Sequence, residues 1–492
     1  MDTALRGTWQ VAMATVVAGG GGWAARRAMA QTNTPVRGGP GVVALAGDPP
    51  TLNPAVSSGF PEQLLGCMVY QGLVQLSTNL VDVKPQLASR WSLSADEKTY
   101  TFDLVPAKWH DGRPFTAEDV RFSLLEFNAK YAPVFAPVAR QIEKIEAPTA
   151  SRVVVTLKQP FGPFLRTLTC AAGAAIMPRH VYAGANPIGH AATTTAPVGT
   201  GPFKLESWRR GDRVNLVRNP DYWEPGKPYL DAIVGKIIPQ GTARTQALLA
   251  GEIDFVSSYF LSSSDHEVIA KSRKLKLVQS GFPPGNSLLI FNLRRKPLDD
   301  ARVRQALFMA TNREFLHKTA FSLEGDVGVT PFNSKFDWAA AEIDYRKLYP
   351  YNVARANQLL DEAGVARDAS GKRFAVDFVI SGDAPDRIQA ALAVKSMWRQ
   401  VGVDVNVVMI ERTAQIKRVF ADRDFGVGME RYTTFGDPAL GIARTFTTAA
   451  IGRTFGQAAL RARAMGFSGK SAVDPRHVPI IQRAFQPTGD PT

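Results

Sequence analysis

Residues 98–124 read KTYTFDLVPAKWHDGRPFTAEDVRFSL, and this stretch decides the fold because it specifies a strand, a turn and a helix in succession. Apolar residues alternate with polar ones over 98–105, which predicts a strand with one buried face. Asp111-Gly112 then supplies a strong turn signal. The helix that follows begins at Thr116, a favourable N-cap. Asp119 stands three positions later, as in a capping box in which Asp replaces the usual Glu.

Strands and helices alternate irregularly along the rest of the chain, which indicates an α/β or α+β class. Residues 151–161 and 212–223 have the composition of strands. Apolar residues at helical spacing predict helices over 302–318, 354–364 and 386–403.

The chain has 492 residues and a formal net charge of +14 at pH 7. At roughly 150 residues per domain, this length predicts two to four domains. The basic residues are scattered, and the densest cluster, KSRKLK (271–276), is better explained as a solvated face than as a phosphate track. We therefore expect no nucleic-acid partner, although a basic exported protein would favour anionic solutes or membrane surfaces. No run of apolar residues is long enough to predict a spanning helix.

Residues 1–30 have the pattern of a cleaved secretory leader. The apolar run VAMATVVAGGGGWAA (11–25) precedes Ala28-Met29-Ala30, which fits the small-x-small rule for signal peptidase. Four successive glycines, Gly19–Gly22, disfavour the alternative of a short buried helix. No cysteine lies near the expected cut, so we expect a periplasmic protein without a lipid anchor.

Cys67 and Cys170 are the only cysteines. Two cysteines exclude a disulfide-rich scaffold and a cysteine-rich metal site. An export context permits one bond between them, but the sequence does not establish their distance, so their pairing stays open.

The extended segment 87–124 closely resembles a signature of the family 5 solute-binding proteins, the dipeptide- and oligopeptide-type receptors of ABC importers. Other segments resemble this family in the same order along the chain: GDPPTLNP (47–54), YQGLVQLS (70–77), PVGTGPFKLESW (197–208), RNPDYWEPGKPYLD (218–231), ALLAGEIDF (247–255), DARVRQAL (300–307) and ANQLLDEAG (356–364). The resemblance covers roughly residues 40–445, so chance is a poor explanation.

The resemblance implies an α/β fold of the two-lobed periplasmic-binding-protein type (class II), with an extra α+β subdomain inserted in lobe 1. The implied layout is a signal peptide at 1–30, lobe 1 at 31–62 and 198–272, the inserted subdomain at 63–197, lobe 2 at 273–456 and an atypical tail at 457–492. A ligand that contacts both lobes would favour the closed state. A membrane permease and an ATPase would then recognise that state.

The resemblance also directs the search for ligand contacts to MERYTTFGDPALGIAR (429–444), a loop after an expected strand. In peptide-binding relatives, an acid three residues before the Asp/Glu-Pro pair binds the peptide amine. Here Thr434 occupies that position, and Asp437 beside the proline is a candidate replacement. The ligand candidates are Tyr432, Thr434, Asp437, Arg431 and Arg444 from lobe 2, with Ser58, Gly59 and Tyr259 from lobe 1. The alternative for each is an ordinary turn or surface residue.

Motifs for catalysis are incomplete. His266-Glu267 begins like HExxH but lacks the second histidine, and GFSGKS (466–471) lacks the second glycine of GxSxG. A catalytic His110–Asp111 pair is disfavoured because neighbours along a strand point to opposite faces, and His110 has no assigned role. We expect no enzyme activity, no catalytic residue, no metal site and no cofactor, although the resemblance leaves a nickel- or haem-type ligand open.

The family resemblance ends near residue 455. Residues 456–492 lack a sustained period and contain four prolines. One interpretation is a divergent but ordered terminus. The favoured one is a disrupted reading frame or truncation, which would leave lobe 1 without a strand and reduce its stability.

The expected function is capture of a peptide or peptide-sized solute by a monomeric receptor, which delivers it to the permease and ATPase of an ABC importer. Two alternatives are a receptor-like scaffold or chaperone whose altered tail impairs transport, and a secreted hydrolase. The hydrolase is the weaker alternative because a nucleophile–base motif is missing.

Overall fold

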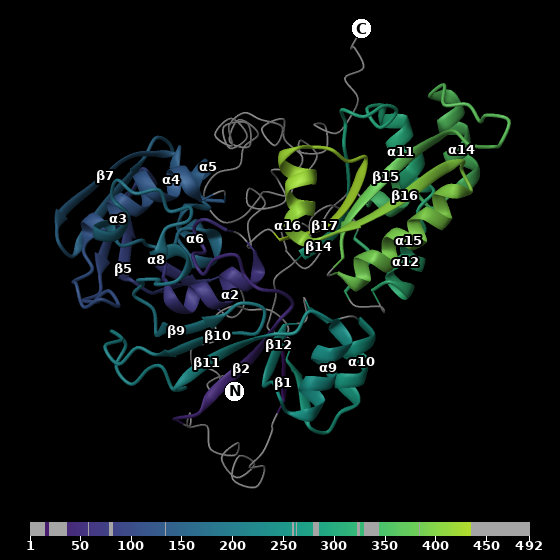
Figure 1. The fold of residues 1–492 in the computed structure, drawn as a ribbon. Coiled ribbons are helices and arrows are strands. Elements are labelled where there is room, and N and C mark those ends of the chain that lie inside the picture. Colours follow the sequence, from purple (N-terminus) through teal and green to yellow (C-terminus); the bar gives the residue numbers. More distant parts are fainter. Residues whose placement is uncertain are drawn as a thin grey trace. The chain divides into compact units, whose positions relative to one another are not determined.

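The computed structural model describes residues 15–18, 37–57, 59–77, 82–132, 134–257, 260–261, 263–278, 285–321, 325–328, 344–382 and 384–433. The chain divides into two compact units. Unit 1 comprises Met1–Phe260, Val268–Pro283 and Phe435–Ala472, and unit 2 comprises Leu261–Glu267, Pro284–Thr434 and Val473–Thr492. Each unit is built on its own mixed sheet, as the expected two-lobed α/β class requires (Figure 1).

Unit 1 contains a seven-stranded sheet with the order β13-β1-β12-β2-β11-β10-β9 (Figure 1). Its strands are β1 Thr15–Ala18, β2 Pro40–Leu45, β9 Phe203–Arg209, β10 Arg213–Arg218, β11 Ala232–Ile237, β12 Phe255–Ser257 and β13 Leu275–Val278. β2 runs parallel to β11 and β12, whereas the other pairs are antiparallel. The associated helices are α2 Phe60–Val69, α9 Gly241–Ala250 and α10 Ser263–Lys271. The strand predicted at 212–223 is β10, with Val214 and Leu216 fully buried.

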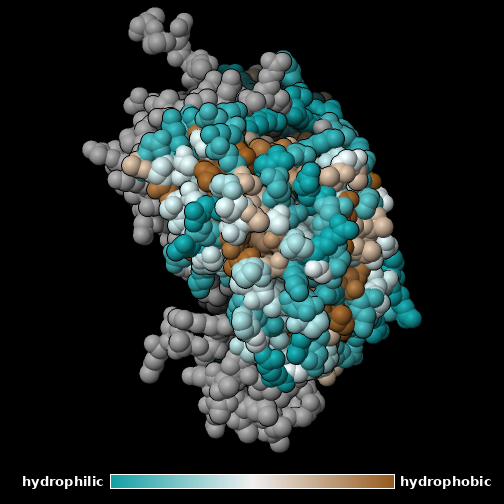
Figure 2. All heavy atoms as spheres, turned by 90° about the vertical axis from the view of Figure 1, so that its left-hand side faces the viewer, coloured by the Kyte–Doolittle hydropathy of each residue, from teal (hydrophilic) through white to brown (hydrophobic). Residues whose placement is uncertain are grey.

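A second, antiparallel sheet of unit 1 has the order β5-β6-β8-β7 and lies within the stretch predicted to form the inserted subdomain. Its strands are β5 Ala88–Leu93, β6 Thr99–Leu104, β7 Ile142–Thr149 and β8 Arg152–Leu157, and a small sheet pairs β3 Val74–Leu76 with β4 Val83–Pro85. The helical segments are α3 Ala117–Phe122, η1 Ser123–Phe127, α4 Asn128–Tyr131, α5 Ala136–Ala139, α6 Phe164–Thr167, η2 Cys170–Ala172, α7 Arg179–Tyr182 and α8 Ala191–Thr194. Figure 2 shows this side of the molecule, where hydrophilic residues predominate and hydrophobic ones are interspersed among them.

The strand–turn–helix prediction for residues 98–124 is confirmed. β6 buries Phe102 completely, and α3 begins after Thr116 as its N-cap. The carboxylate of Asp119 accepts a hydrogen bond from the Thr116 backbone N–H at 2.9 Å, which is one half of the predicted capping box. The Thr116 hydroxyl also donates to this carboxylate, at 3.2 Å. The other oxygen of Asp119 accepts the backbone N–H of Arg179, so the same side chain joins α3 to α7.

His110, for which the sequence suggests no role, holds a tight turn in place. Its ring Nδ1 accepts a hydrogen bond from the backbone N–H of Gly199 at 3.3 Å, and Nε2 lies 3.0 Å from the carbonyl oxygen of Gly201. This pattern requires the neutral tautomer with the proton on Nε2. Burial lowers the pKa of His110 from 6.5 to about 4, which keeps the ring neutral. A Cβ on Gly199 would lie 1.8 Å from the carbonyl oxygen of Val69, so the turn requires glycine there.

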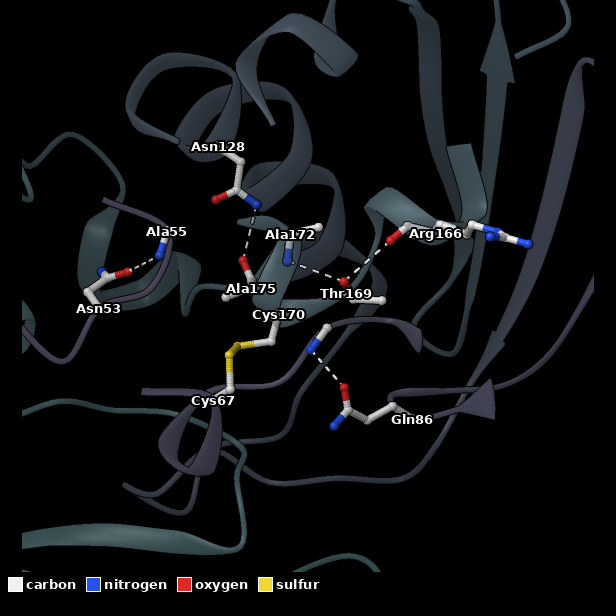
Figure 3. Close-up of a disulfide and its surroundings, with 11 residues drawn as sticks. Asn53, Ala55, Cys67, Gln86, Asn128, Arg166, Thr169, Cys170, Ala172 and Ala175 are labelled. Atoms are coloured by element: carbon white, nitrogen blue, oxygen red, sulfur yellow. Dashed lines mark hydrogen bonds between the residues drawn. A yellow bond between two sulfur atoms is a disulfide. The ribbon is translucent and has the colours of Figure 1, made fainter. Parts of the chain in front are cut away.

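Cys67 and Cys170 form a disulfide bond, which answers the question that the sequence leaves open (Figure 3). Their sulfur atoms are 2.05 Å apart and their Cα atoms 5.8 Å apart. The bond joins α2 to η2 across a separation of 103 positions. Such a bond persists in an oxidising compartment.

Unit 2 contains a four-stranded sheet with the order β14-β17-β15-β16. Its strands are β14 Gly285–Phe291, β15 Phe374–Ser381, β16 Val403–Ile410 and β17 Val427–Thr433. Its helical segments are α11 Ala301–Met309, α12 Arg313–Thr319, α13 Tyr345–Leu348, α14 Val353–Glu362, α15 Pro385–Arg399, α16 Arg412–Ile416 and η5 Lys417–Ala421. β15 is parallel to both β16 and β17, whereas β14 is antiparallel to β17. No helix in the described ranges is long and apolar enough to span a bilayer.

The helix predicted over 302–318 is wrong as a single element, because the structure divides it into α11 and α12. The side chain of Asn312 accepts a hydrogen bond from the backbone N–H of Phe315 at 2.9 Å and caps a new helix. An Asn favours this N-cap geometry over a position inside a helix, which explains the break. Gly364 follows the end of α14 with a positive φ of 77°, a conformation that favours glycine after a helix.

Candidate functional site

The carboxyl ends of β15 and β17 lie at the same edge of the sheet of unit 2. The two strands are parallel neighbours, with Phe378 opposite Val427. β15 ends at the buried Ser381, and β17 ends at Thr433. The prediction of a loop from residue 429 is therefore wrong for 429–433, which belong to the strand. Ligands of open α/β sheets bind at the carboxyl ends of strands. This edge is therefore the candidate site on unit 2.

A buried carboxylate organises this edge. Glu430 on β17 is 4% exposed, and its Oε1 accepts hydrogen bonds from Gln415 at 2.7 Å and from Nη1 of Arg412 at 2.9 Å. Its Oε2 accepts a hydrogen bond from Nη1 of Arg387 at 3.0 Å. The partners come from α15 and α16, which follow β15 and β16. A charge at this depth is tolerated only when it is paired and hydrogen-bonded, as it is here.

Two arginines contact the buried carboxylate of this cluster. The guanidinium groups of Arg387 and Arg412 both form ion pairs with Glu430. Arg412 is the more accessible of the two, because 30% of its side chain is exposed against 8% for Arg387. Guanidinium groups bind carboxylates and phosphates through paired hydrogen bonds. Arg412 is therefore the candidate of the two arginines for contact with an anionic ligand.

Tyr432 and Arg431 are consecutive on β17 and point to opposite faces. Tyr432 shares the face of Glu430, two residues away, and is buried, whereas Arg431 is exposed. The Tyr432 side chain is therefore buried on the face of β17 that carries Glu430. Both residues stay predicted ligand contacts.

Gly59 of unit 1 is the N-cap of α2, where it leaves space for a buried acid. A Cβ on Gly59 would lie 2.3 Å from the carboxylate of Glu62, which accepts a hydrogen bond from Ser57 at 2.7 Å. Burial raises the pKa of Glu62, although the Ser57 hydrogen bond opposes this rise. Gly59 therefore has a packing role, and its predicted ligand contact is untested. The other candidates, Ser58, Tyr259, Thr434, Asp437 and Arg444, lie outside the described residues.

The sequence interpretation missed the residues that build the cluster of unit 2. The available signal was a single acid, Glu430, inside the apolar strand VGMERYT. An ionisable residue in a buried strand requires a partner. The partner arginines lie 43 and 18 positions away, so the sequence did not identify them.

His110 and Asp111, the neighbouring pair of the opening stretch, contact different partners. Asp111 contacts Nε2 of His180 at 2.6 Å, whereas the ring of His110 turns towards Gly199 and Gly201. Burial raises the pKa of Asp111, but the hydrogen bond from His180 and that from the Arg113 backbone outweigh burial and lower it overall. Over the described ranges, no group of three or more His, Cys, Asp or Glu side chains is arranged to hold a metal ion.

Comparison with known proteins identifies relatives of this chain. It is 30% identical over 344 residues to an ABC transporter peptide-binding protein of Brucella ovis, which covers 68% of this chain and 62% of that protein. It is 32% identical over 325 residues to the glutathione-binding protein GsiB of Salmonella typhimurium, which covers 66% of this chain and 61% of that one. The chain thus spans about three fifths of the length of these curated relatives.

A solved structure has the same fold. The oligopeptide-binding protein AppA of Bacillus subtilis, in complex with a nonapeptide, superposes with a TM-score of 0.73 at 26% identity, and the match covers 81% of this chain and 80% of that one. This likeness confirms the predicted two-lobed α/β class. The family model described as "Bacterial extracellular solute-binding proteins, family 5 Middle" matches residues 82–452. The chain therefore belongs to the family 5 bacterial extracellular solute-binding proteins.

Proposed function

We propose that this chain is the solute receptor of an ABC importer and that it captures a peptide or peptide-sized solute with a free carboxylate. The observation that carries the proposal is the partly exposed guanidinium group of Arg412, which the buried Glu430 holds at the carboxyl ends of the parallel strands of unit 2. The relatives support the solute class, because their names state that they bind peptides or glutathione.

The receptor works by binding and release without a chemical step. Glu430 holds the two guanidinium groups in fixed positions before ligand arrives, which reduces the entropy lost when an anionic group binds. A ligand that also contacts unit 1 shifts the protein towards its closed form. A membrane permease and its ATPase recognise that form and accept the solute.

The proposal includes a periplasmic location, a monomeric state and no enzymatic activity. The Cys67–Cys170 disulfide supports an oxidising compartment. The candidate site supports binding because its charged groups are engaged in a fixed network around Glu430. Mass spectrometry of the bound and the released solute checks the absence of enzymatic activity, since a receptor releases its ligand chemically unchanged.

Thermal unfolding with defined probes tests the function. The probes are reduced glutathione, tri-alanine and tri-alanine amide, and a ligand at a hundred times its Kd is expected to add about 2.7 kcal/mol of stability. The amide is expected to bind about tenfold more weakly because it lacks the carboxylate that the guanidinium groups pair with. Absence of any shift with glutathione and the tripeptide would overturn the proposed solute class.

A matched pair of variants locates the binding site. Arg412→Met is expected to remove the preference for the free carboxylate over the amide. Arg418→Met is the control, because Arg418 is similarly exposed but pairs with Asp377 and Asp424. Equal loss of preference in both variants would indicate a general charge effect and would remove Arg412 from the site.

A further inference from the structure

One strand of the large sheet of unit 1 comes from the expected leader. β1, Thr15–Ala18, lies between β12 and β13 and runs antiparallel to both. Val16 stands opposite Val256 of β12 and opposite Leu277 of β13. β12 and β13 are therefore joined through β1 and not to each other.

β1 supports both of its neighbours. Within the described part of the chain, β13 pairs with β1 alone, over all four positions from Leu275 to Val278. β12 is also paired with β2, through Phe255 and Val43. The helix α9 packs against β1 and β12, so the strand lies inside the unit. Loss of β1 would expose the facing edges of two strands, whose backbone N–H and C=O groups require hydrogen bonds.

We propose that residues 15–18 are an internal strand donor that completes the sheet of unit 1 in the uncut chain. Cleavage after Ala30, which the Ala28-Met29-Ala30 pattern predicts, would remove this strand and open a slot one strand wide between β12 and β13. Export and completion of the sheet then compete for the same four residues, because export requires an accessible leader whereas the sheet holds it in a backbone ladder. This inference goes beyond the proposed receptor function and does not depend on it.

Amide hydrogen exchange of the uncut chain tests whether residues 15–18 complete the sheet. Val16→Pro removes a backbone N–H from the middle of β1 without changing the length of the chain. Ala24→Pro is the control, because it places a proline in the same leader outside β1. Amides of 255–257 and 275–278 are expected to exchange at least about tenfold faster in Val16→Pro than in Ala24→Pro. Equal protection of 275–278 in the two variants would overturn the proposal.

A chain that begins at residue 31 supplies a second test, with a synthetic peptide of residues 11–22 as the added strand. The truncated chain is expected to lose protection at 275–278, and the peptide is expected to restore it. The amides of 275–278 could instead stay protected in the truncated chain without the peptide, either in a monomer or through contact with a second copy. In that case another segment fills the space between β12 and β13, and the assignment to residues 15–18 is wrong. The truncated chain could also lose protection at 275–278 and fail to regain it when the peptide is added. That result would also contradict the assignment to residues 15–18.

Discussion

The guanidinium of Arg387 donates a hydrogen bond to the carboxylate of Glu430 at 3.0 Å, although the two residues are 43 positions apart. Both side chains are almost fully buried, at 8% and 5% exposure. The contact ties the first turn of α15 to β17, whose last residues belong to the stretch predicted as the ligand loop. It therefore links the stability of unit 2 to the geometry of the candidate site.

Loss of one charge from this cluster is expected to destabilise the protein more than loss of the whole pair. Glu430→Gln removes the charge that the buried Arg387 and the partly exposed Arg412 pair with, and is expected to lower the free energy of unfolding by about 3 kcal/mol. Adding Arg387→Met to Glu430→Met is expected to recover part of the loss seen in Glu430→Met alone, because it also removes the buried cation that Glu430 pairs with. Urea denaturation measures the cycle, and strictly additive losses would contradict a coupled pair.

Removal of the disulfide is expected to lower stability by about 4 kcal/mol, because the bond closes a loop of about a hundred residues in the unfolded chain. Cys67→Ser and Cys170→Ser should each produce this loss, and the double variant should be no less stable than either single variant. A reducing agent should lower the melting temperature of the wild type and leave that of the double variant unchanged. Insensitivity of the wild type to complete reduction would show that the bond contributes nothing.

Stability is expected to fall in mild acid because of His110. The pKa of His110 is about 4 in the folded protein, whereas the ordinary value of 6.5 applies in the unfolded chain. The unfolded chain therefore binds the proton first as the pH falls. The contribution is complete above pH 6.5 and is lost progressively between pH 6.5 and pH 4. It amounts to about 2 kcal/mol when the partial exposure of the ring is allowed for.

Two variants separate His110 from other titrating groups. His110→Asn is expected to flatten the pH dependence of the free energy of unfolding between pH 4 and 6.5. His180→Asn is the matched control, because its ring contacts Asp111 at the surface and not the 199–201 turn. The same flattening in both variants would assign the effect to another group.

The turn held by His110 is expected to reject any side chain at Gly199. Gly199→Ala places a Cβ 1.8 Å from the Val69 carbonyl oxygen, which belongs to the rigid backbone of α2. The expected loss is about 3 kcal/mol or more in the free energy of unfolding, since overpacking forces the backbone to move. Gly47→Ala is the control, because its added Cβ meets no atom within 4 Å. Similar losses in the two variants would contradict the steric explanation.

Local signals in the sequence predicted a large part of the fold. The alternation over 98–105, the Asp111-Gly112 turn and the Thr116 cap act between residues a few positions apart, so their partners are visible in the sequence. The single helix expected over 302–318 was wrong for a similarly local reason. Asn312 suits an N-cap better than a helix interior, and the apolar periodicity obscured this.

The sequence by itself determined the family and the types of many elements, because these depend on order along the chain. Only the tertiary structure decided the partners of His110, the Cys67–Cys170 bond and the arginines that meet Glu430. These contacts join residues from 18 to 103 positions apart, and their distances depend on how several elements pack together. Packing therefore determined the chemistry of the candidate site, because a buried charge is stable only where the fold brings its partners within hydrogen-bond distance.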